Sequence, residues 1–173
     1  MKKARRSGFT LIEMIVVVAI LVALAGILVP VVSSEMASSK TGKALADCNR
    51  VAGGLNQYIK DTAFFPTGNQ GASTNHFLYG LGTLPGSNDF ASGASASLDG
   101  FLSVNTNGGS NWKGPYMQSV KADPWGRAYV VNTHGYFNSA ENVWVISAGP
   151  DGNVDTAQNA TTPGGDDIGV LID

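Results

Sequence analysis

The chain has 173 residues, with 11 Lys and Arg, 13 Asp and Glu, and one cysteine. This length fits one modest domain with a small core. A lone cysteine excludes an intramolecular disulfide framework. We expect Cys48 to be a small core residue, because free cysteines are among the most buried residue types.

Charge is distributed unevenly along the chain. Four of the eleven basic residues fall within the first six positions, and no Lys or Arg follows Arg127. Nucleic-acid binding needs a basic face, so we expect no nucleic-acid partner. An acidic end of this kind suits a cation site or a solvated tail. Its acidic residues are Glu141, Asp151, Asp155, Asp166, Asp167 and Asp173.

An uncharged run extends from Met14 to Val32 and is lengthened by Phe9, Leu11 and Ile12. It is about as long as a helix needs to cross the roughly 30 Å core of a bilayer. A secretory signal peptide has a shorter apolar run of about 7–15 residues and then a small-residue cleavage site. The basic residues before the run predict a cytoplasmic N-terminus, with the rest of the chain on the far side of the membrane.

Glu13 interrupts this apolar segment close to its start. A carboxylate at mid-membrane costs about 2.5–3.5 kcal/mol on insertion scales, and a simple signal anchor gains nothing from it. Such a residue is a functional-site hypothesis by default. Its natural partner is a positive charge at the same depth, such as a new N-terminal amine on a neighbouring copy.

The residues around Glu13 resemble a processing signal. The sequence KKARRSG at 2–8, followed by FTLIE at 9–13, is similar to the class III signal of type IV pilins and pseudopilins. The resemblance implies that a prepilin peptidase cleaves after Gly8 and that Phe9 is N-methylated. It also implies that Glu13 pairs with the N-terminus of the adjacent subunit. Pro30 matches the helix-interior proline of that family and is expected to kink or melt the helix, which neighbours in a membrane can compensate.

Beyond Pro30, apolar residues recur at steps of three and four. They predict one long helix from about Phe9 to Lys60, apolar all round in its first half and amphipathic in its second. Asp61-Thr62 and Pro66 predict its end. Two glycines inside it weaken the helix by up to ~1 kcal/mol each; close packing against a sheet is one explanation for them and chance is another. The apolar residues at these steps are Leu45, Cys48, Val51 or Ala52, Leu55 and Ile59, and the two glycines are Gly53 and Gly54.

Residues 66–115 are rich in Gly, Ser, Asn and Ala, which predicts a long loop with one short helix near Phe77–Leu84. His76 and His134 have no partner at metal-binding or catalytic spacing, so we expect both to be surface or hydrogen-bonded residues. Several aromatic residues are expected to hold the loop on the core: Phe64, Phe65, Phe77, Tyr79, Phe90 and Phe101.

Strand patterns come late in the chain. Two runs of β-branched and aromatic residues, 127–132 and 142–147, predict a hairpin with its loop at 133–141. Residues 169–172 predict a third strand, and DPWG at 123–126 a turn. The fold class is therefore α+β, with a long helix packed on a small antiparallel sheet. We expect a leader at 1–8, a transmembrane or filament-core helix at 9–32 and a globular domain at 33–173.

The second half resembles the major pseudopilins of type II secretion. The similar segments occur in that family's order: FFPTGNQG at 64–71, GPYM at 114–117, DPWGRAY at 123–129, VISAGPDG at 145–152 and DDIG at 166–169. Residues 72–111 are not covered and look like an insertion. The resemblance implies an inner-membrane, single-pass protein that assembles into a helical filament driving protein export. Its partners are copies of itself, prepilin peptidase, other pseudopilins, the inner-membrane assembly platform and, before assembly, membrane lipid.

Two other functions remain open at this level. A type IV pilus subunit for adhesion, motility or DNA uptake has the same N-terminus, although the paired C-terminal cysteines common in such pilins are absent. A membrane-anchored enzyme is the other. The sequence shows no nucleophile-elbow motif and no Ser/His/Asp arrangement, so we do not expect an enzyme.

The same resemblance implies a structural calcium ion near the C-terminus. Calcium takes 6–8 oxygen ligands from carboxylates and carbonyls. Asp151, Asn153 and Asp155 also stand at positions one, three and five of an EF-hand-like loop, but Thr156 and Thr162 occupy the positions of its Gly and Glu, so an EF-hand is not supported. A solvated acidic loop is the alternative. The ligands that the resemblance implies are the side chains of Asp151, Asp166 and Asp167 and the backbone oxygens of Ala148 and Ile168, and Asn153 or Asp155 could add further ligands.

Overall fold

The computed structural model describes residues 8–66, 75–86, 94–106 and 111–172. The chain forms two compact units, residues 1–39 and 40–173. Helix α1, Leu11–Thr62, contributes to both units. The predicted helix is confirmed, with each end within two residues of the predicted position.

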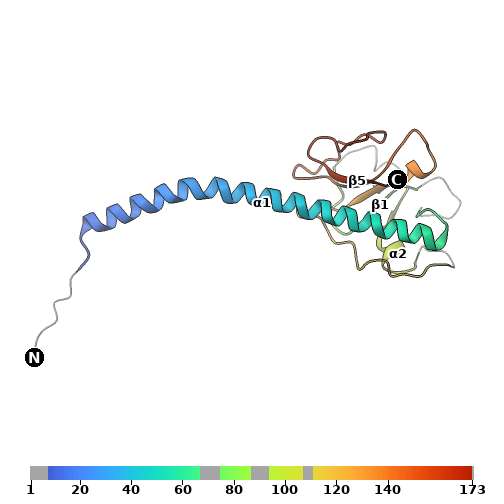
Figure 1. The fold of residues 1–173 in the computed structure, drawn as a ribbon, viewed down its shortest axis with the longest axis horizontal. Helices are drawn as coiled ribbons and strands as arrows, with labels where there is room; N and C mark the ends of the chain where they lie inside the picture. The colour runs from blue at the N-terminus through green and yellow to red at the C-terminus, as the bar shows by residue number, and fades with distance from the viewer. Residues whose placement is uncertain (1–7, 67–74, 87–93, 107–110, 173) are drawn as a thin grey trace, which may run out of the picture. The chain divides into compact units, whose positions relative to one another are not determined.

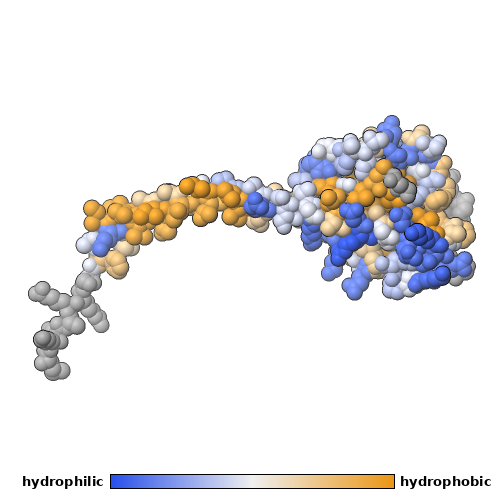
Figure 2. Space-filling view, in the orientation of Figure 1, coloured by the Kyte–Doolittle hydropathy of each residue, from blue (hydrophilic) through white to orange (hydrophobic). Residues whose placement is uncertain are grey.

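In the first unit, most side chains of α1 between Leu11 and Val32 are apolar, and the large apolar ones are exposed (Figure 2). By its length and composition, α1 could cross a membrane. Pro30 lies inside α1, and the helix continues through it. The expected melting at Pro30 is therefore wrong. Two hydroxyls bond to helix carbonyls close to Pro30: Ser33 Oγ donates to the carbonyl of Val29 at 2.9 Å, and Ser34 Oγ donates to that of Val31 at 2.8 Å.

The second unit (Figure 1) is built around a five-stranded sheet. The strand order in this sheet is β2-β1-β3-β4-β5. Strand β3 pairs antiparallel with β1 and with β4, and β4 pairs antiparallel with β5. Strand β2 pairs parallel with β1. The predicted α+β class, a long helix packed on a small and mostly antiparallel sheet, is confirmed, and β2 adds one parallel pair at the edge. The strands are β1 Asn75–Tyr79, β2 Ala94–Ser97, β3 Val130–Asn132, β4 Val143–Ser147 and β5 Ile168–Ile172. The elements between them are α2 Asp99–Leu102 and the 3-10 turn η2 His134–Tyr136.

Both faces of this sheet are covered. Successive side chains of a strand point to opposite faces, and in β4 all five residues are buried. Val143 and Val145 pack in a first cluster with the buried face of α1. Trp144 and Ile146 point to the opposite face, which we call the second face, and pack in a second cluster there. The α1 side contributes Cys48, Val51, Ala52, Leu55 and Tyr58 to the first cluster. The predicted burial of Cys48 is confirmed.

The middle of the chain differs from the expectation. The predicted helix near Phe77–Leu84 is wrong, because Asn75–Tyr79 forms β1, which pairs with β3 in the centre of the sheet. The predicted long loop is also wrong for the described part of 66–115, which contains β1, β2 and α2. Leu98, Phe101 and Leu102 are fully buried there.

The expected aromatic anchors divide into two groups. Phe77 and Phe101 are buried as predicted, and Tyr79 packs partly buried on the second cluster. Phe64 and Phe65 are exposed instead. Phe90 and the side chain of His76 lie outside the described residues.

The late strand predictions are confirmed. The runs 127–132, 142–147 and 169–172 correspond to β3, β4 and β5, with β3 and β4 antiparallel. His134 is hydrogen-bonded as expected, because its Nδ1 lies 2.8 Å from Glu141 Oε1.

Candidate functional site

The chemistry-bearing residues of the second unit gather in the loop between β4 and β5, residues 148–167, which we call the acidic loop. Carboxylate oxygens of Asp151, Asp155 and Asp166 all lie within 4.8 Å of one another. The first two residues are exposed and the third is partly buried. Three carboxylates this close repel one another unless a cation or hydrogen-bond donors offset their charge.

The acidic loop is folded onto the second face of the sheet. Val154 is buried against Trp144 and Ile146. The indole Nε1 of Trp144 donates to the carbonyl of Ala160 at 3.1 Å, and Asn142 Nδ2 donates to the same oxygen at 2.9 Å. The carboxylates are thus carried on a loop with fixed attachments to the sheet.

Asp167 is separate from the three-carboxylate cluster. Its Oδ2 accepts the backbone N–H groups of Asp155 at 2.8 Å and Thr156 at 2.7 Å, and the Thr156 hydroxyl. Its Oδ1 is buried without a hydrogen-bond partner among the described residues. Burial raises the pKa of Asp167, while these hydrogen bonds oppose the change. A buried carboxylate oxygen without a partner carries a desolvation penalty.

The two backbone oxygens expected as ligands have partners in the fold. The Ala148 carbonyl accepts the N–H of Gly152 at 3.0 Å, and the Ile168 carbonyl accepts the Cys48 thiol at 3.5 Å. A carbonyl has two lone pairs, so one hydrogen bond leaves capacity for a second partner. The structure therefore brings together the carboxylates of Asp151, Asp155 and Asp166. The ligand roles of these three residues, and those of Ala148, Asp167 and Ile168, stay predictions.

The turn that carries Asp151 is ordered by its own hydrogen bonds. The Asp151 N–H donates to Asp166 Oδ2 at 3.0 Å, and the Asn153 N–H donates to Asp151 Oδ1 at 2.8 Å. The Asn153 N–H is the main cause that lowers the pKa of Asp151. The carboxylate of Asp151 is therefore stabilised in its charged form.

Arg127 was missed by the sequence reasoning. Its guanidinium lies against this turn and donates to backbone carbonyls of residues 149–151. One feature of the sequence could have indicated it: Arg127 is the last basic residue before the acidic end of the chain.

At the other end of the chain, Gly8 and Phe9 precede the first residue of α1, and Phe9 is 85% exposed. Glu13 has a partner within the chain. Its Oε2 accepts the N–H of Thr10 at 2.8 Å and the Thr10 hydroxyl at 2.7 Å, and the Glu13 N–H is 3.3 Å from Thr10 Oγ1. This reciprocal arrangement is a capping box, which satisfies free N–H groups at a helix start.

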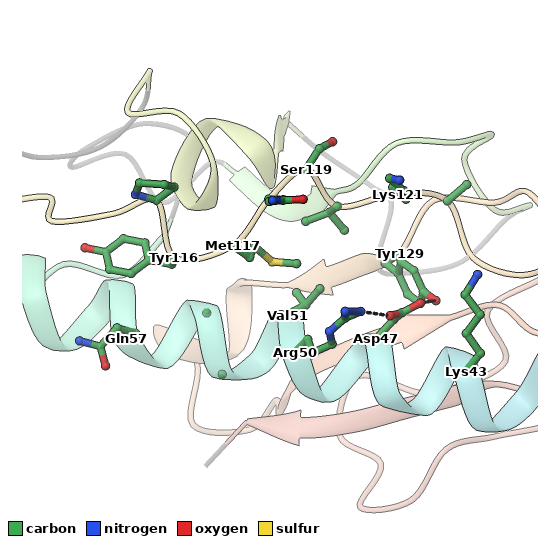
Figure 3. Close-up of a pocket in the computed structure, with 16 residues that line it drawn as sticks. Lys43, Asp47, Arg50, Val51, Gln57, Tyr116, Met117, Ser119, Lys121 and Tyr129 are labelled. Atoms are coloured by element: carbon green, nitrogen blue, oxygen red, sulfur yellow. Dashed lines mark hydrogen bonds and ion pairs between the residues drawn. The ribbon is translucent and has the colours of Figure 1, made fainter.

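A groove of about 840 Å³ runs along α1 in the second unit (Figure 3). It lies between the Lys43–Gln57 part of the helix and residues 115–122. Gly53 and Gly54 line it, and their missing side chains leave room for it; a Cβ on Gly54 would contact Leu102 and Met117, whereas one on Gly53 would meet open space. Gly54 therefore packs closely, against α2 rather than against the sheet.

Opposite charges are paired inside this groove. Asp47 accepts a hydrogen bond from Arg50 at 2.7 Å and another from the Tyr129 hydroxyl at 3.2 Å. Burial, and then the charge of Asp47, raise the pKa of Tyr129. Tyr129 therefore stays a neutral donor that ties α1 to the segment before β3.

Two family models match the chain. One, described as "Type II secretion system (T2SS), protein G", covers residues 93–163, and the other, "Prokaryotic N-terminal methylation motif", covers residues 3–29. The first includes residues 93–111, so the expectation that all of 72–111 is an insertion is wrong for that part.

Curated relatives match over most of their length. The chain is 31% identical over 160 residues to type II secretion system core protein G of Escherichia coli, covering 92% of each chain. It is 32% identical over 130 residues to core protein G of Pseudomonas aeruginosa, covering 75% of each, and 29% identical over 156 residues to that of Aeromonas hydrophila, covering 90% and 91%. A solved structure, the major pseudopilin from the type 2 secretion system of enterohaemorrhagic Escherichia coli, aligns with 79% of this chain and 86% of its own at 21% identity and a TM-score of 0.43.

Proposed function

This chain belongs to the type II secretion system core protein G family, and from that premise we propose that it is the repeating subunit of a pseudopilus that drives protein export. The observation that carries the proposal is the 31% identity to the Escherichia coli protein over 92% of both chains. The subunit acts by assembly: many copies pack their N-terminal helices into one helical filament. Deletion of this gene is expected to abolish secretion of the substrates of the system, and normal secretion by the deletion strain would refute the proposal.

Processing comes first. Prepilin peptidase cleaves after Gly8 and the new amine of Phe9 is methylated. The methylation-motif match over residues 3–29 supports this. So does the position of Gly8 and Phe9 ahead of the first turn of α1, because a peptidase needs backbone that is not engaged in a helix. Removing residues 1–8 takes away four of the eleven basic residues and leaves seven against thirteen acidic ones, a net charge of −6.

Before assembly the subunit is anchored in the bacterial inner membrane by residues 9–32, with its globular part in the periplasm. The exposed apolar surface of α1 in the first unit supports this, since side chains such as Leu11, Ile12 and Val22 are 67–77% exposed. In the filament the same surface packs against other copies. Pro30 serves assembly by leaving one backbone carbonyl of α1 without its usual helical donor. The further partners are other pseudopilins and the inner-membrane assembly platform.

Glu13 has two roles that must be separated: capping α1 within the chain, and pairing its charge with the Phe9 amine of an adjacent subunit. The capping box explains why a carboxylate is tolerated at the helix start. It does not require the charge, because Gln also serves at this position of a capping box. Pairing with an amine does require the charge. We propose that pairing is the role that assembly depends on.

Glu13→Gln separates the two roles, because the amide oxygen still accepts from Thr10 while the charge is lost. We expect this variant to insert and be cleaved normally and yet to form few filaments, as seen by electron microscopy of sheared fibres. Thr10→Val is the matched control, since it weakens the cap and keeps the carboxylate. Abundant filaments from Glu13→Gln together with few from Thr10→Val would show that capping is the role that matters.

The acidic loop is proposed to hold a structural calcium ion. The residues fit a hard divalent cation, because the carboxylate oxygens of Asp151, Asp155 and Asp166 lie within 4.8 Å of one another and such cations prefer oxygen ligands. Asp167, next to Asp166 in the sequence, has a buried Oδ1 without a hydrogen-bond partner among the described residues. Ala148 and Ile168 contribute backbone oxygens. A bound cation offsets the mutual repulsion of the carboxylates and fixes the loop over the sheet.

A cation that binds only the folded chain stabilises it by mass action, by about 2.7 kcal/mol at 100 times its Kd. We therefore expect the melting temperature of the full chain in detergent, followed by the fluorescence of Trp112, Trp125 and Trp144, to rise when calcium replaces chelator. Asp151→Asn is expected to reduce the rise. A midpoint that is the same in calcium and in chelator would refute the calcium proposal and leave the filament function untouched.

A further inference from the structure

The guanidinium of Arg127 is bonded to the first turn of the acidic loop. Its Nη1 donates to the carbonyls of Gly149 at 3.1 Å and Pro150 at 3.3 Å, and its Nη2 donates to the carbonyl of Asp151 at 3.1 Å. Three consecutive carbonyls thus converge on one planar cation. The guanidinium can make all three bonds at once, because it presents five N–H donors in a fixed plane.

The turn is shaped to receive this side chain. Gly152 has φ +83, and a Cβ at this residue would overlap the guanidinium carbon of Arg127. Gly149 also has a positive φ of +58, and its missing Cβ leaves room for the Asp166 backbone. These glycines allow the turn to curl around the guanidinium on one side and against Asp166 on the other.

Arg127 is itself held in place by the sheet. The backbone N–H of Arg127 donates to Asp123 Oδ1 at 2.8 Å, and Asp123 is only 5% exposed. The other oxygen, Asp123 Oδ2, accepts from Ser147 Oγ at 2.6 Å. Ser147 is the last residue of β4, directly before the acidic loop. A closed set of hydrogen bonds therefore connects the end of β4, the 123–127 turn and the start of the acidic loop.

We propose that Arg127 is the positioning residue of the cation site: its guanidinium holds the Asp151 turn in the conformation that brings the three carboxylates together, before any ion binds. This inference rests on the proposed calcium site for its purpose, but the arrangement that it describes is within the chain alone. The hydrogen bonds of the Arg127 guanidinium to this turn go to backbone carbonyl oxygens, so the carboxylates of Asp151, Asp155 and Asp166 stay available to a cation.

Electrostatics and positioning predict opposite effects of removing Arg127. The guanidinium carries a positive charge beside a site for another cation, so charge repulsion alone predicts that its loss strengthens calcium binding. Loss of a group that orients the ligands instead weakens metal binding, typically by about 10–100-fold. The direction of the change in affinity therefore distinguishes a positioning residue from a nearby charge.

The experiment compares Arg127→Met and Arg127→Lys with a matched control, Arg50→Met, in the full chain in detergent. Met keeps an apolar stem over Gly152, and Lys keeps the charge without the fork. Arg50 has the same charge, but its side chain is 73% exposed on α1 and pairs with Asp47 in the groove. Two quantities are measured: calcium affinity by titration calorimetry, and deuterium uptake of the 148–153 peptide in chelator.

We expect calcium binding to weaken about 10–100-fold in Arg127→Met, less in Arg127→Lys, and not in Arg50→Met. In chelator, uptake at 148–153 is expected to rise in Arg127→Met while the β4 peptide 143–147 stays protected. Equal or tighter calcium binding by Arg127→Met would overturn the inference, as would unchanged uptake at 148–153.

Two further outcomes are also decisive. Loss of protection throughout β4 in both Arg127 variants would assign Arg127 a role in the whole fold rather than in the loop, and would overturn the inference. Absence of calcium binding by the unsubstituted chain would refute the proposed cation site; the uptake in chelator then decides alone whether Arg127 holds the turn.

Discussion

Phe101→Ala tests whether the middle of the chain belongs to the core. Phe101 is 1% exposed, and its ring meets that of Tyr58 on α1 edge to face, with centroids 5.6 Å apart at 89°. Truncating a buried Phe to Ala typically costs about 3–5 kcal/mol, from lost burial and the cavity left behind. Domains of this kind are stable by about 5–15 kcal/mol, so the variant should lose a large part of its stability.

The assay is urea unfolding of the full chain in detergent, followed by tryptophan fluorescence. All three tryptophans lie in residues 40–173, so the signal reports on the second unit. Phe137→Ala is the matched control, because Phe137 is 56% exposed; we expect it to cost less than about 1 kcal/mol. A loss in Phe101→Ala no larger than that of Phe137→Ala would refute the placement of α2 against α1.

The remaining predictions concern single sites. Gly53→Ala is expected to raise the free energy of unfolding by up to ~1 kcal/mol, because the added Cβ meets open space on a helix, and urea unfolding measures it. Burial raises the pKa of the Cys48 thiol to about 12, so we expect no reaction with a thiol reagent at mildly alkaline pH until urea unfolds the chain; rapid labelling of the folded chain would contradict this. Burial acts to raise the pKa of Glu141, but hydrogen bonds from His134 and Asn138 outweigh it and lower the pKa from its ordinary value. A depressed folded pKa stabilises the fold above the unfolded value and loses this contribution as the pH falls through the folded value. Glu141→Gln should therefore flatten the decline of the urea midpoint below about pH 4.5, and an unchanged decline would count against it.

The strong periodic patterns of the sequence predicted the elements that they encode. The apolar run and the stripe through Cys48 and Leu55 define α1, and the β-branched runs define β3, β4 and β5. In these segments the local pattern and the tertiary burial agree.

The elements missed are those whose burial is decided elsewhere in the chain. Residues 94–97 read ASAS, with no large apolar residue to alternate, and they become a strand through parallel pairing with β1. Phe77 and Leu78 are adjacent apolar residues, which fit a helix or a strand equally well. Their pairing with Asn132 and Val131 of β3 decides in favour of a strand.

The candidate site shows the same division. The family resemblance indicated Asp151 and Asp166, the spacing of an EF-hand-like loop added Asp155, and the fold brings the carboxylates of all three within 4.8 Å. The position of Arg127 against the loop depends on bonds through Asp123 and Ser147, which are distant in sequence from the acidic residues. No spacing rule relates these residues, so only the folded chain reveals them.

The acidic loop is also the cover of the second face of the sheet, where Val154 packs on Trp144 and Ile146. A subunit whose loop has lifted presents this apolar face to the solvent, and such surfaces promote aggregation and cleavage by proteases. The supply of subunits competent for assembly then depends on how long this loop stays closed before they assemble. Conditions that open the loop would shorten the filament by depleting its precursors, even where every contact between assembled subunits is unchanged.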